Sequence, residues 1–293
     1  MIVGSRSSSD AARLVTPTML VLWLVLATVP LWITRIGLYP YLGIEILIWS
    51  LYALAFNLVL GTAGLPSFGH GAYFGIGAYA FGLCQLDIVA NLWICLAAAA
   101  VVPADFGLVS FDLTDNVAFY YFVLAVFAVG TAVLWRLVHS PYGRVVAAIR
   151  QSEVRAAHLG YNVWLYKASV FALSAAVSGF AGGLFAMAQL AAFPDVMSLH
   201  QSGYVVMMTL VGGGLVSFWG PVIGVFLFLT ARDVIGALTN AWMLYFGLLF
   251  IAIVLFRPEG IAGALSAAAQ QHSLNALRRR GTSAMRLLVG GGR

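Results

Sequence analysis

The sequence predicts an all-α, polytopic helical membrane protein with about eight membrane segments, some of them broken or re-entrant. Of its 293 residues, 62% are hydrophobic and only 9% are charged. Soluble domains carry roughly 25% charged residues, so this composition does not supply a soluble surface. Repeated apolar runs, several of them near the about 20 residues that a helix needs to cross a bilayer, point the same way. We expect one membrane domain over 19–256, between a polar segment at 1–18 and a basic tail at 257–293.

The first apolar run follows a polar start that contains Arg6 and Arg13 and shows no small-residue cleavage site. We therefore expect an uncleaved signal-anchor helix over 19–36. The segments 88–102 and 204–216 are also apolar but look too short to cross a bilayer alone. Further helices are expected at approximately 39–60, 66–86, 118–138, 168–192, 218–235 and 240–256.

Basic residues gather in three places, which are the start, the 136–167 connection and the tail; these hold thirteen of the fifteen Lys and Arg. This clustering orients membrane proteins with the basic segments in the cytoplasm, and it does not indicate nucleic-acid binding. The segment 103–117 has three Asp and no base, which predicts an external segment. However, if every apolar segment before Val102 crosses, the chain is back inside there. One crossing is missing, or one segment does not cross.

Three pairs of glycines are spaced four apart, which lets helix backbones approach closely. Two stretches, "GLPSFGHGAYFGIGAY" at 64–79 and "VGGGLVSFWGPVIG" at 211–224, predict interrupted helices or re-entrant turns. Such breaks need surrounding protein or a water-filled cavity, and in transporters they mark the pathway. His70 is a candidate proton relay, but we expect a hydrogen-bonded structural residue. The residues predicted to line the pathway or pack helices are Gly69, His70, Gly71, Gly75, Gly179, Gly183, Gly212, Gly213, Gly220, Pro221 and Gly224.

The 139–167 connection is the longest polar stretch inside the membrane domain, and Pro141 and Gly143 open it. From Arg144 to Leu159, apolar and charged residues alternate as in an amphipathic helix, which Gly160 would end. Such a helix lies flat on lipid or docks into a groove of a partner, and the residues alone leave both alternatives open.

Five motifs, in this order, resemble the branched-chain amino acid permease family of ABC importers, in particular its second permease type. They cover most of the chain from about residue 40 to 263. The motifs are "NLVLGTAGLPSFGHGAYFGIGAY" (57–79), "SPYGRVVAAIRQSEVRAAHLGYNVWLYK" (140–167), "FALSAAVSGFAGGLFA" (171–186), "LVGGGLVSFWGPVIG" (210–224) and "LFRPEGIAG" (255–263).

The resemblance implies a permease of the bacterial inner membrane that pairs with a paralogous permease. Two cytoplasmic ATP-binding subunits would drive it, and an external solute-binding protein would deliver an amino acid, amide or urea. It also implies that the 139–167 connection docks in a cleft of the ATPase, with Glu153 and Gly160 matching family positions. The expected coupling residues are Arg144, Arg150, Glu153, Arg155 and Gly160.

No P-loop is present, because the only lysine, Lys167, lies between Tyr166 and Ala168. The sequence contains no constellation that indicates an enzyme, a metal site or a cofactor, so none is expected. The alternative function is an ATPase-independent secondary transporter or channel. Its candidate ion-coupling groups are Glu45, Asp87 and Asp233.

One feature departs from the family pattern. Family members usually carry a further long region before the external segment, whereas here "LWICLAAAAVV" runs straight into "PADFGLV". An added stretch would also supply the missing crossing. We therefore expect an internally shortened family member, with a junction near Ala97 to Val102.

Overall fold

The structure is a computed structural model that describes residues 17–33, 39, 41–87, 116–215, 217–239, 241–256, 260, 261 and 263. Throughout these ranges, every regular element is a helix. The elements in chain order are α1 Pro17–Trp32, α2 Tyr41–Asn57, the π-helix η2 Leu58–Ala63, α3 His70–Asp87, α5 Asn116–His139, α6 Pro141–Gln151, α7 Glu153–His158, α8 Val163–Gln189, the 3₁₀-helix η3 Pro194–Met197, α9 Leu199–Gly212, α10 Gly220–Leu238 and α11 Trp242–Phe256.

Helices dominate because a chain in lipid must satisfy its backbone hydrogen bonds within each segment. Four helical stretches are long and apolar enough to cross a membrane, and they cover 41–63, 117–139, 163–189 and 220–238. The described parts of α1 and α11 are shorter apolar helices. The structure thus confirms a polytopic helical membrane protein, and the number of about eight segments stays a prediction.

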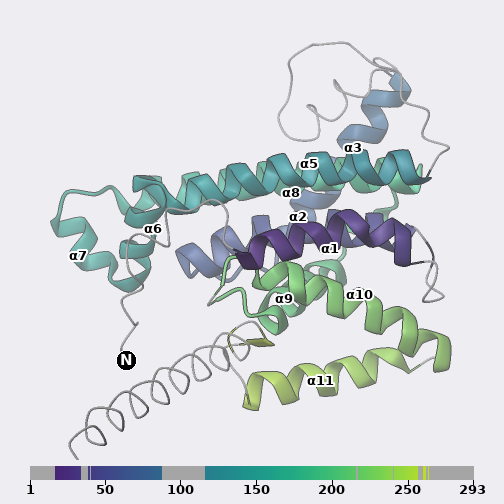
Figure 1. Cartoon of the computed structure of the whole chain (residues 1–293). Helices are drawn as coiled ribbons and strands as arrows, with labels where there is room; N and C mark the ends of the chain where they lie inside the picture. The colour runs from purple at the N-terminus through teal and green to yellow at the C-terminus, as the bar shows by residue number, and fades with distance from the viewer. Residues whose placement is uncertain are drawn as a thin grey trace, which may run out of the picture.

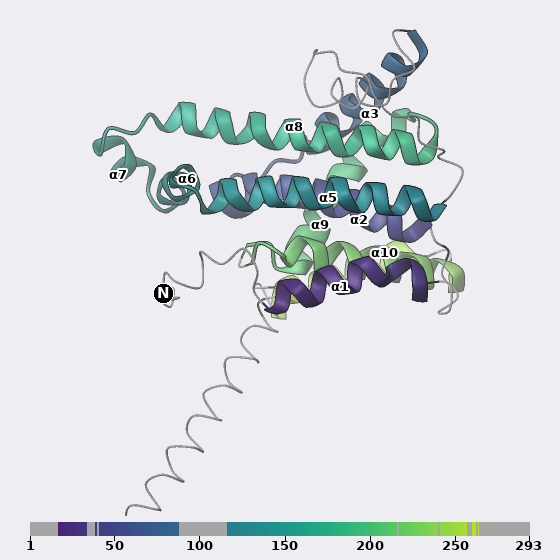
Figure 2. The same cartoon turned by 45° about the horizontal axis from the view of Figure 1, so that its top comes forward.

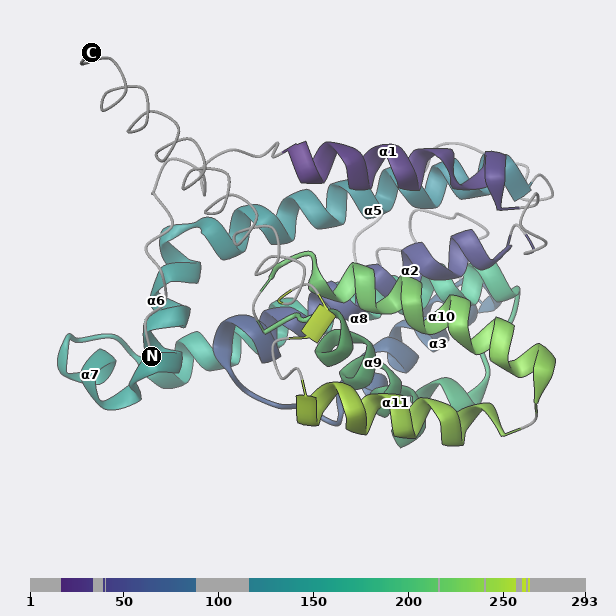
Figure 3. The same ribbon diagram turned by 60° about the horizontal axis from the view of Figure 1, so that its bottom comes forward.

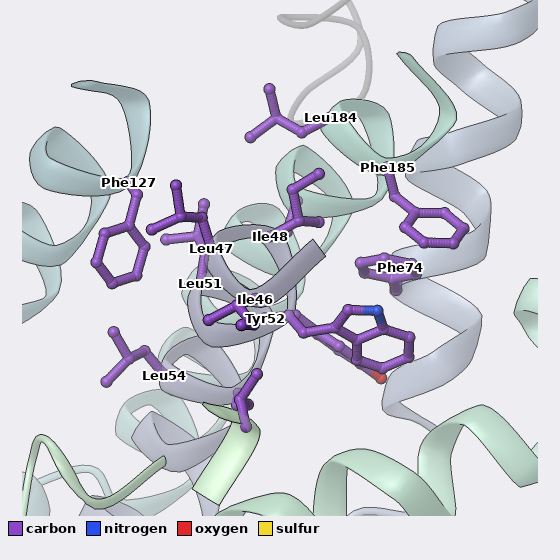
Figure 4. Packing of buried hydrophobic residues seen from close by; sticks show 14 of the residues in the cluster. Ile46, Leu47, Ile48, Leu51, Tyr52, Leu54, Phe74, Phe127, Leu184 and Phe185 are labelled. Atoms are coloured by element: carbon purple, nitrogen blue, oxygen red, sulfur yellow. The ribbon is translucent and has the colours of Figure 1, made fainter. Parts of the chain in front are cut away.

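The central helix of the bundle is α2, whose side chains are nearly all buried. It contacts α5, α8, α9 and α10, while α3 packs most extensively on α8. Aromatic side chains fill the junction of α2, α3 and α8, where Phe74 lies between Tyr52 and Phe185 (Figure 4). The ring centroids of Tyr52 and Phe74 are 4.5 Å apart. This junction fixes the start of α3, on which the candidate pathway residues lie.

The long helices run between two ends of the bundle, and α6 and α7 project beyond one of them (Figure 1). We call this the α6–α7 end. Both α1 and α10 begin at this end, while α5 arrives there (Figure 3). The last residue of α3, Asp87, and the first of α5, Asn116, both lie toward the opposite end (Figures 1 and 2).

These directions bear on the expected count of crossings. α3 ends and α5 begins toward the same end of the bundle (Figure 2). The segment 88–102 itself lies outside the described ranges. Both predicted explanations, a missing crossing or a segment that does not cross, therefore stay predictions.

Several predictions concern residues outside the described ranges. These are the segment 1–16, the apolar run 88–102, the acidic stretch up to residue 115, the junction at Ala97–Val102 and most of the basic tail.

Candidate functional site

The α6–α7 end begins with a well-formed helix start. Ser140 is the N-cap of α6, and its hydroxyl accepts a hydrogen bond from the backbone N–H of Gly143 at 3.3 Å. Pro141 occupies the first turn, where its missing N–H costs nothing. The predicted helix after Ser140 is confirmed, and Pro141 and Gly143 belong to its first turn rather than to a turn before it.

The predicted single helix from Arg144 to Leu159 is wrong, because the structure divides it in two. α6 ends at Gln151, Ser152 is extended with φ −164° and ψ 107°, and α7 follows. The Ser152 hydroxyl accepts from the N–H of Arg155 at 3.4 Å, and Glu153 places a negative charge in the first turn of α7. Both features favour a new helix start. Gly160 then takes a left-handed φ of 88°, which fits its predicted role as the stop.

The apolar side of α6 faces the protein. Val146 and Ile149 are buried at 3% exposure each. An amphipathic helix that lies flat on lipid would instead turn this side to the bilayer. The α6 segment is therefore anchored to the bundle rather than laid on a membrane surface.

Two contacts hold the α6–α7 end on the beginning of α8. The ammonium group of Lys167 forms an ion pair with the Glu153 carboxylate at 2.6 Å. The hydroxyls of Tyr142 and Ser169 are 2.6 Å apart. Glu153, predicted to contact an ATPase, is thus tied to this chain's own lysine, although exposed pairs of this kind contribute little stability.

Large apolar side chains of α7, of the following turn and of the first turn of α8 are exposed. The exposed fraction is 67% for Val154, 77% for Leu159 and 75% for Trp164, and Leu165 and Arg155 are exposed beside them in sequence. We call Val154, Arg155, Leu159, Trp164 and Leu165 the docking patch. Exposed apolar groups gathered on a polar connection mark interaction surfaces.

Arg150 differs from the other predicted coupling arginines. Arg144, Arg150 and Arg155 are all exposed, and the guanidinium of Arg150 also donates to the backbone carbonyl of Gly61 in η2. The predicted coupling arginines are therefore divided by their contacts, because Arg150 is tied to the bundle through Gly61. Residue type alone carries no signal for this division.

Both predicted interruptions are present. Residues 64–69 separate η2 from α3, and residues 213–219 separate α9 from α10. Their ends meet, since a Cβ placed on Gly61 would lie 2.8 Å from the carbonyl oxygen of Gly214 and would collide with the Asn57 amide oxygen. The two glycine-rich motifs, about 150 residues apart in sequence, thus form one junction.

The predicted small-residue packing is present, with some different members. A Cβ on Gly71 or Gly75 would collide with Ser202 or Met197, so these glycines bring α3 onto η3 and α9. Gly220 lies against Gly213, and Gly224 against Met208 and Gly212, in the turn between α9 and α10. Gly69 does not pack closely, because a Cβ there would meet nothing within 4 Å, and its place on the pathway stays a prediction.

The closest approach of α3 to α8 depends on two glycines that the sequence reasoning missed. A Cβ on Gly77 would collide with the backbone of Gly179, and one on Gly182 with the Phe74 carbonyl. Gly77 lies two residues after Gly75, and Gly182 precedes Gly183, so the four-residue spacing identified the helices but selected neighbouring positions. Gly183 itself is buried in α8.

His70 begins α3 and is fully buried. Its Nε2 is 2.7 Å from the hydroxyl of Ser174, and its Nδ1 is 3.2 Å from that of Ser67. The Ser174 hydroxyl donates to the carbonyl of Ala55 at 2.6 Å. Because both ring nitrogens have serine partners, the geometry is that of a structural residue that joins α2, α3 and α8.

A charged cluster lies toward the opposite end of the bundle. Arg232 of α10 contacts both carboxylate oxygens of Glu45 in α2, at 3.1 and 2.9 Å, and its Nε contacts Asp233 at 3.1 Å. The phenol of Tyr39 donates to Asp233 at 2.9 Å. Sequence reasoning identified Glu45 and Asp233 singly and missed Arg232, because it took 218–235 as one apolar helix. The side chain of Asp87 lies outside the described part.

These features define a class: a helical membrane transport subunit with a projecting basic connection and interrupted, glycine-packed helices. The chain belongs to the family described as "Branched-chain amino acid transport system / permease component", whose profile matches residues 41–125 and 110–256.

Two curated relatives are permeases named "High-affinity branched-chain amino acid transport system permease protein LivM". The protein from Salmonella typhimurium is 25% identical over 288 aligned positions, which cover 73% of this chain and 68% of the relative. The protein from Escherichia coli is 24% identical, with the same coverage. No solved structure matches significantly.

The alignment contains a gap in this chain. Coverage of 73% corresponds to about 214 of the 293 residues, while the alignment runs over 288 positions. Some 74 positions therefore carry residues of the relative and none of this chain.

Proposed function

We propose that the chain is the permease subunit of an ATP-driven importer and forms half of a translocation pathway for branched-chain amino acids or related small polar solutes. The observation that carries the proposal is the exposed docking patch. It includes Val154 of α7, a helix that projects from the bundle (Figure 1). A separate cytoplasmic ATP-binding subunit is the partner that this patch fits. A paralogous permease, a second ATP-binding subunit and an external solute-binding protein complete the importer.

Burial on α6 supports docking over lipid contact. Val146 and Ile149 pack against the bundle. The exposed apolar residues of this connection lie on α7, on the turn after it and on the first turn of α8. The Glu153–Lys167 pair and the Tyr142–Ser169 contact fix this segment on α8. A movement of α7 is therefore passed to α8. This helix carries Gly179, a candidate pathway residue, and Ser174, the partner of His70.

The charged cluster argues against the ion-coupled alternative. Glu45 and Asp233, two of its three candidate groups, both contact Arg232. Both carboxylates are occupied by the guanidinium, whereas an ion-coupling carboxylate must be free to bind and release a cation during transport. We therefore propose that ATP hydrolysis drives transport. In this proposal the α6–α7 end faces the cytoplasm.

Co-purification and uptake together test the proposal. The tagged chain is co-expressed with the ATP-binding, permease and solute-binding proteins encoded by neighbouring genes, and the purified complex is placed in proteoliposomes. We expect an ATP-binding subunit to co-purify and uptake of leucine or a related solute to require ATP. Uptake by the chain alone that a protonophore abolishes would instead establish the secondary transporter.

A matched pair of variants makes the test specific to the docking patch. Trp164→Ala combined with Val154→Asp removes its apolar surface and should lower ATPase capture. Leu248→Ala changes a similarly exposed apolar residue on α11, at 59% exposure, and should not. Equal capture by both variants would remove the patch from the proposal.

We also propose that the first half of the chain is internally shortened relative to its curated relatives. The alignment gap of some 74 positions supports this, as does the absence of the family's usual region before residue 103. Sequencing of the gene across codons 97–102 tests whether the junction is genuine. An added in-frame segment in the genomic DNA would contradict it.

A further inference from the structure

The side chain of Arg150 lies across the boundary between α6 and the interrupted segment of the bundle. It comes from the last turn of α6, and its guanidinium donates to the carbonyl of Gly61. The last carbonyls of a helix lack intrahelical donors, and a cation there also complements the helix dipole. The contact therefore caps η2 with a charge supplied by the α6–α7 end.

Gly64 lies in close contact with the side chain of Arg150. A Cβ at Gly64 would lie 2.8 Å from Cγ, 3.1 Å from Cδ and 3.1 Å from Nε of Arg150. Gly64 also has a φ of 72°, a conformation that glycine adopts without penalty. The missing Cβ of Gly64 and its positive φ thus let the aliphatic part of the Arg150 side chain cross the end of η2.

η2 itself is a π-helix that continues α2 without a break. Such segments are rare and occur often at functional positions. Gly61 is confined on its other side by the Asn57 side chain and, at 2.8 Å from an added Cβ, by the carbonyl of Gly214. A displacement of Arg150 therefore acts on η2, which packs closely against the turn between α9 and α10.

The chain beyond Gly64 leads directly to the break before α3. Five residues separate Gly64 from His70, whose ring is held by Ser67 and Ser174. Ser174 in turn bonds the Ala55 carbonyl in the last turn of α2. The segment between η2 and α3 is thus tied at one end to Arg150 and at the other to His70.

We propose that Arg150 is a positioning residue that transmits movement of the α6–α7 end to the interrupted η2–α3 segment, rather than a contact to the ATPase. This inference rests on the proposed function, since it concerns the same coupling movement. The outward docking patch receives the motion, and Arg150 passes it inward to the junction of Gly61, Gly64 and Gly214.

The ratio of uptake to ATP hydrolysis tests the inference in the full complex. Arg150→Gln should leave ATPase capture and hydrolysis near the wild-type level while uptake per ATP falls about tenfold, as expected for the loss of a charge-assisted hydrogen bond. Arg150→Lys keeps a charged donor and should restore much of the coupling. The control is Arg136→Gln, which alters an exposed arginine at the end of α5.

A second variant approaches the same contact without removing the charge. Gly64→Ala pushes a methyl group into the Arg150 stem and should also lower uptake per ATP. An unchanged ratio in Arg150→Gln overturns the inference, as does a failure of Arg150→Lys to restore coupling. Parallel loss of hydrolysis and uptake, in proportion to the assembled complex, assigns Arg150 a purely structural role and also overturns it. If the wild-type chain captures no ATPase, the proposed function itself fails.

Discussion

The guanidinium of Arg232 forms two hydrogen bonds with the carboxylate of Glu45, at 3.1 and 2.9 Å, across 187 positions of sequence. Glu45 is buried, and Asp233 shares the same guanidinium. In a membrane bundle, such a cluster joins two helices, here α2 and α10, by charge in addition to their apolar contact.

Removal of Arg232 should destabilise the protein more than an ordinary surface change. Arg232→Ala leaves the Glu45 carboxylate buried without its partner, at a cost of roughly 2–4 kcal/mol. We expect a lower midpoint of thermal unfolding in detergent, and the double variant Arg232→Ala with Glu45→Ala should recover part of the loss. A single variant as stable as the wild type would show that the pair does not hold α2 to α10.

Tyr39 should give this cluster a dependence on alkaline pH. Burial, and then the hydrogen bond to Asp233, raises the pKa of the Tyr39 phenol from 10.0 to about 12. Because the folded pKa is the higher one, its stabilising contribution is complete below pH 10 and is lost as the pH rises toward 12. The stability difference between the wild type and Tyr39→Phe should therefore shrink over this window. A constant difference would contradict the contact.

Gly77 should tolerate no side chain, because its neighbour is backbone. Gly77→Ala places a methyl group on Gly179 and forces α3 away from α8, with a cost of about 1–3 kcal/mol for overpacking. Gly236→Ala is the control, since a Cβ there meets nothing within 4 Å. Thermal unfolding of both variants checks this, and equal midpoints would rule out close approach at Gly77.

Two serines of α8 should respond in opposite ways. Ser174→Ala removes a partner from both His70 and the Ala55 carbonyl, at a cost of about 1–3 kcal/mol. Ser178 is equally buried, but its hydroxyl has no hydrogen-bond partner in the described part of the chain. Ser178→Ala should therefore be neutral or slightly stabilising. A similar loss of stability in both variants would mean that the hydrogen bonds of His70 do not stabilise the fold.

Much of the fold could be predicted because its signals are local. Glycine, proline and serine mark both interruptions, and the apolar runs mark the long helices. The division of α6 from α7 also had a local signal, namely Ser152 followed by Glu153, a combination typical of a helix start. The crossing count could not be completed from the sequence, because the apolar character of 88–102 says nothing about the ends at which α3 stops and α5 begins.

The candidate site was less accessible to sequence reasoning because its contacts are distant. Nothing near Arg232 in the sequence indicates Glu45, and nothing in α6 indicates that Arg150 faces Gly61 while Arg155 faces outward. Gly77 and Gly182 were missed because neither has a glycine four residues away, and Gly77 contacts α8 whereas Gly71 and Gly75 contact α9 and η3. Which residues come into contact depends on how two helices cross. The sequence of either helix alone does not determine that crossing.

The central claim is that a separate ATP-binding subunit binds the α6–α7 end. Site-directed photo-crosslinking at Val154 tests this claim most directly. A photoreactive amino acid is placed at Val154 in the assembled transporter, and the same amino acid at Leu248 on α11 serves as the control. The account predicts a covalent product with the ATP-binding subunit from position 154 and none from position 248. Crosslinks from position 154 to lipid or to an external protein, with none to the ATP-binding subunit, would contradict it.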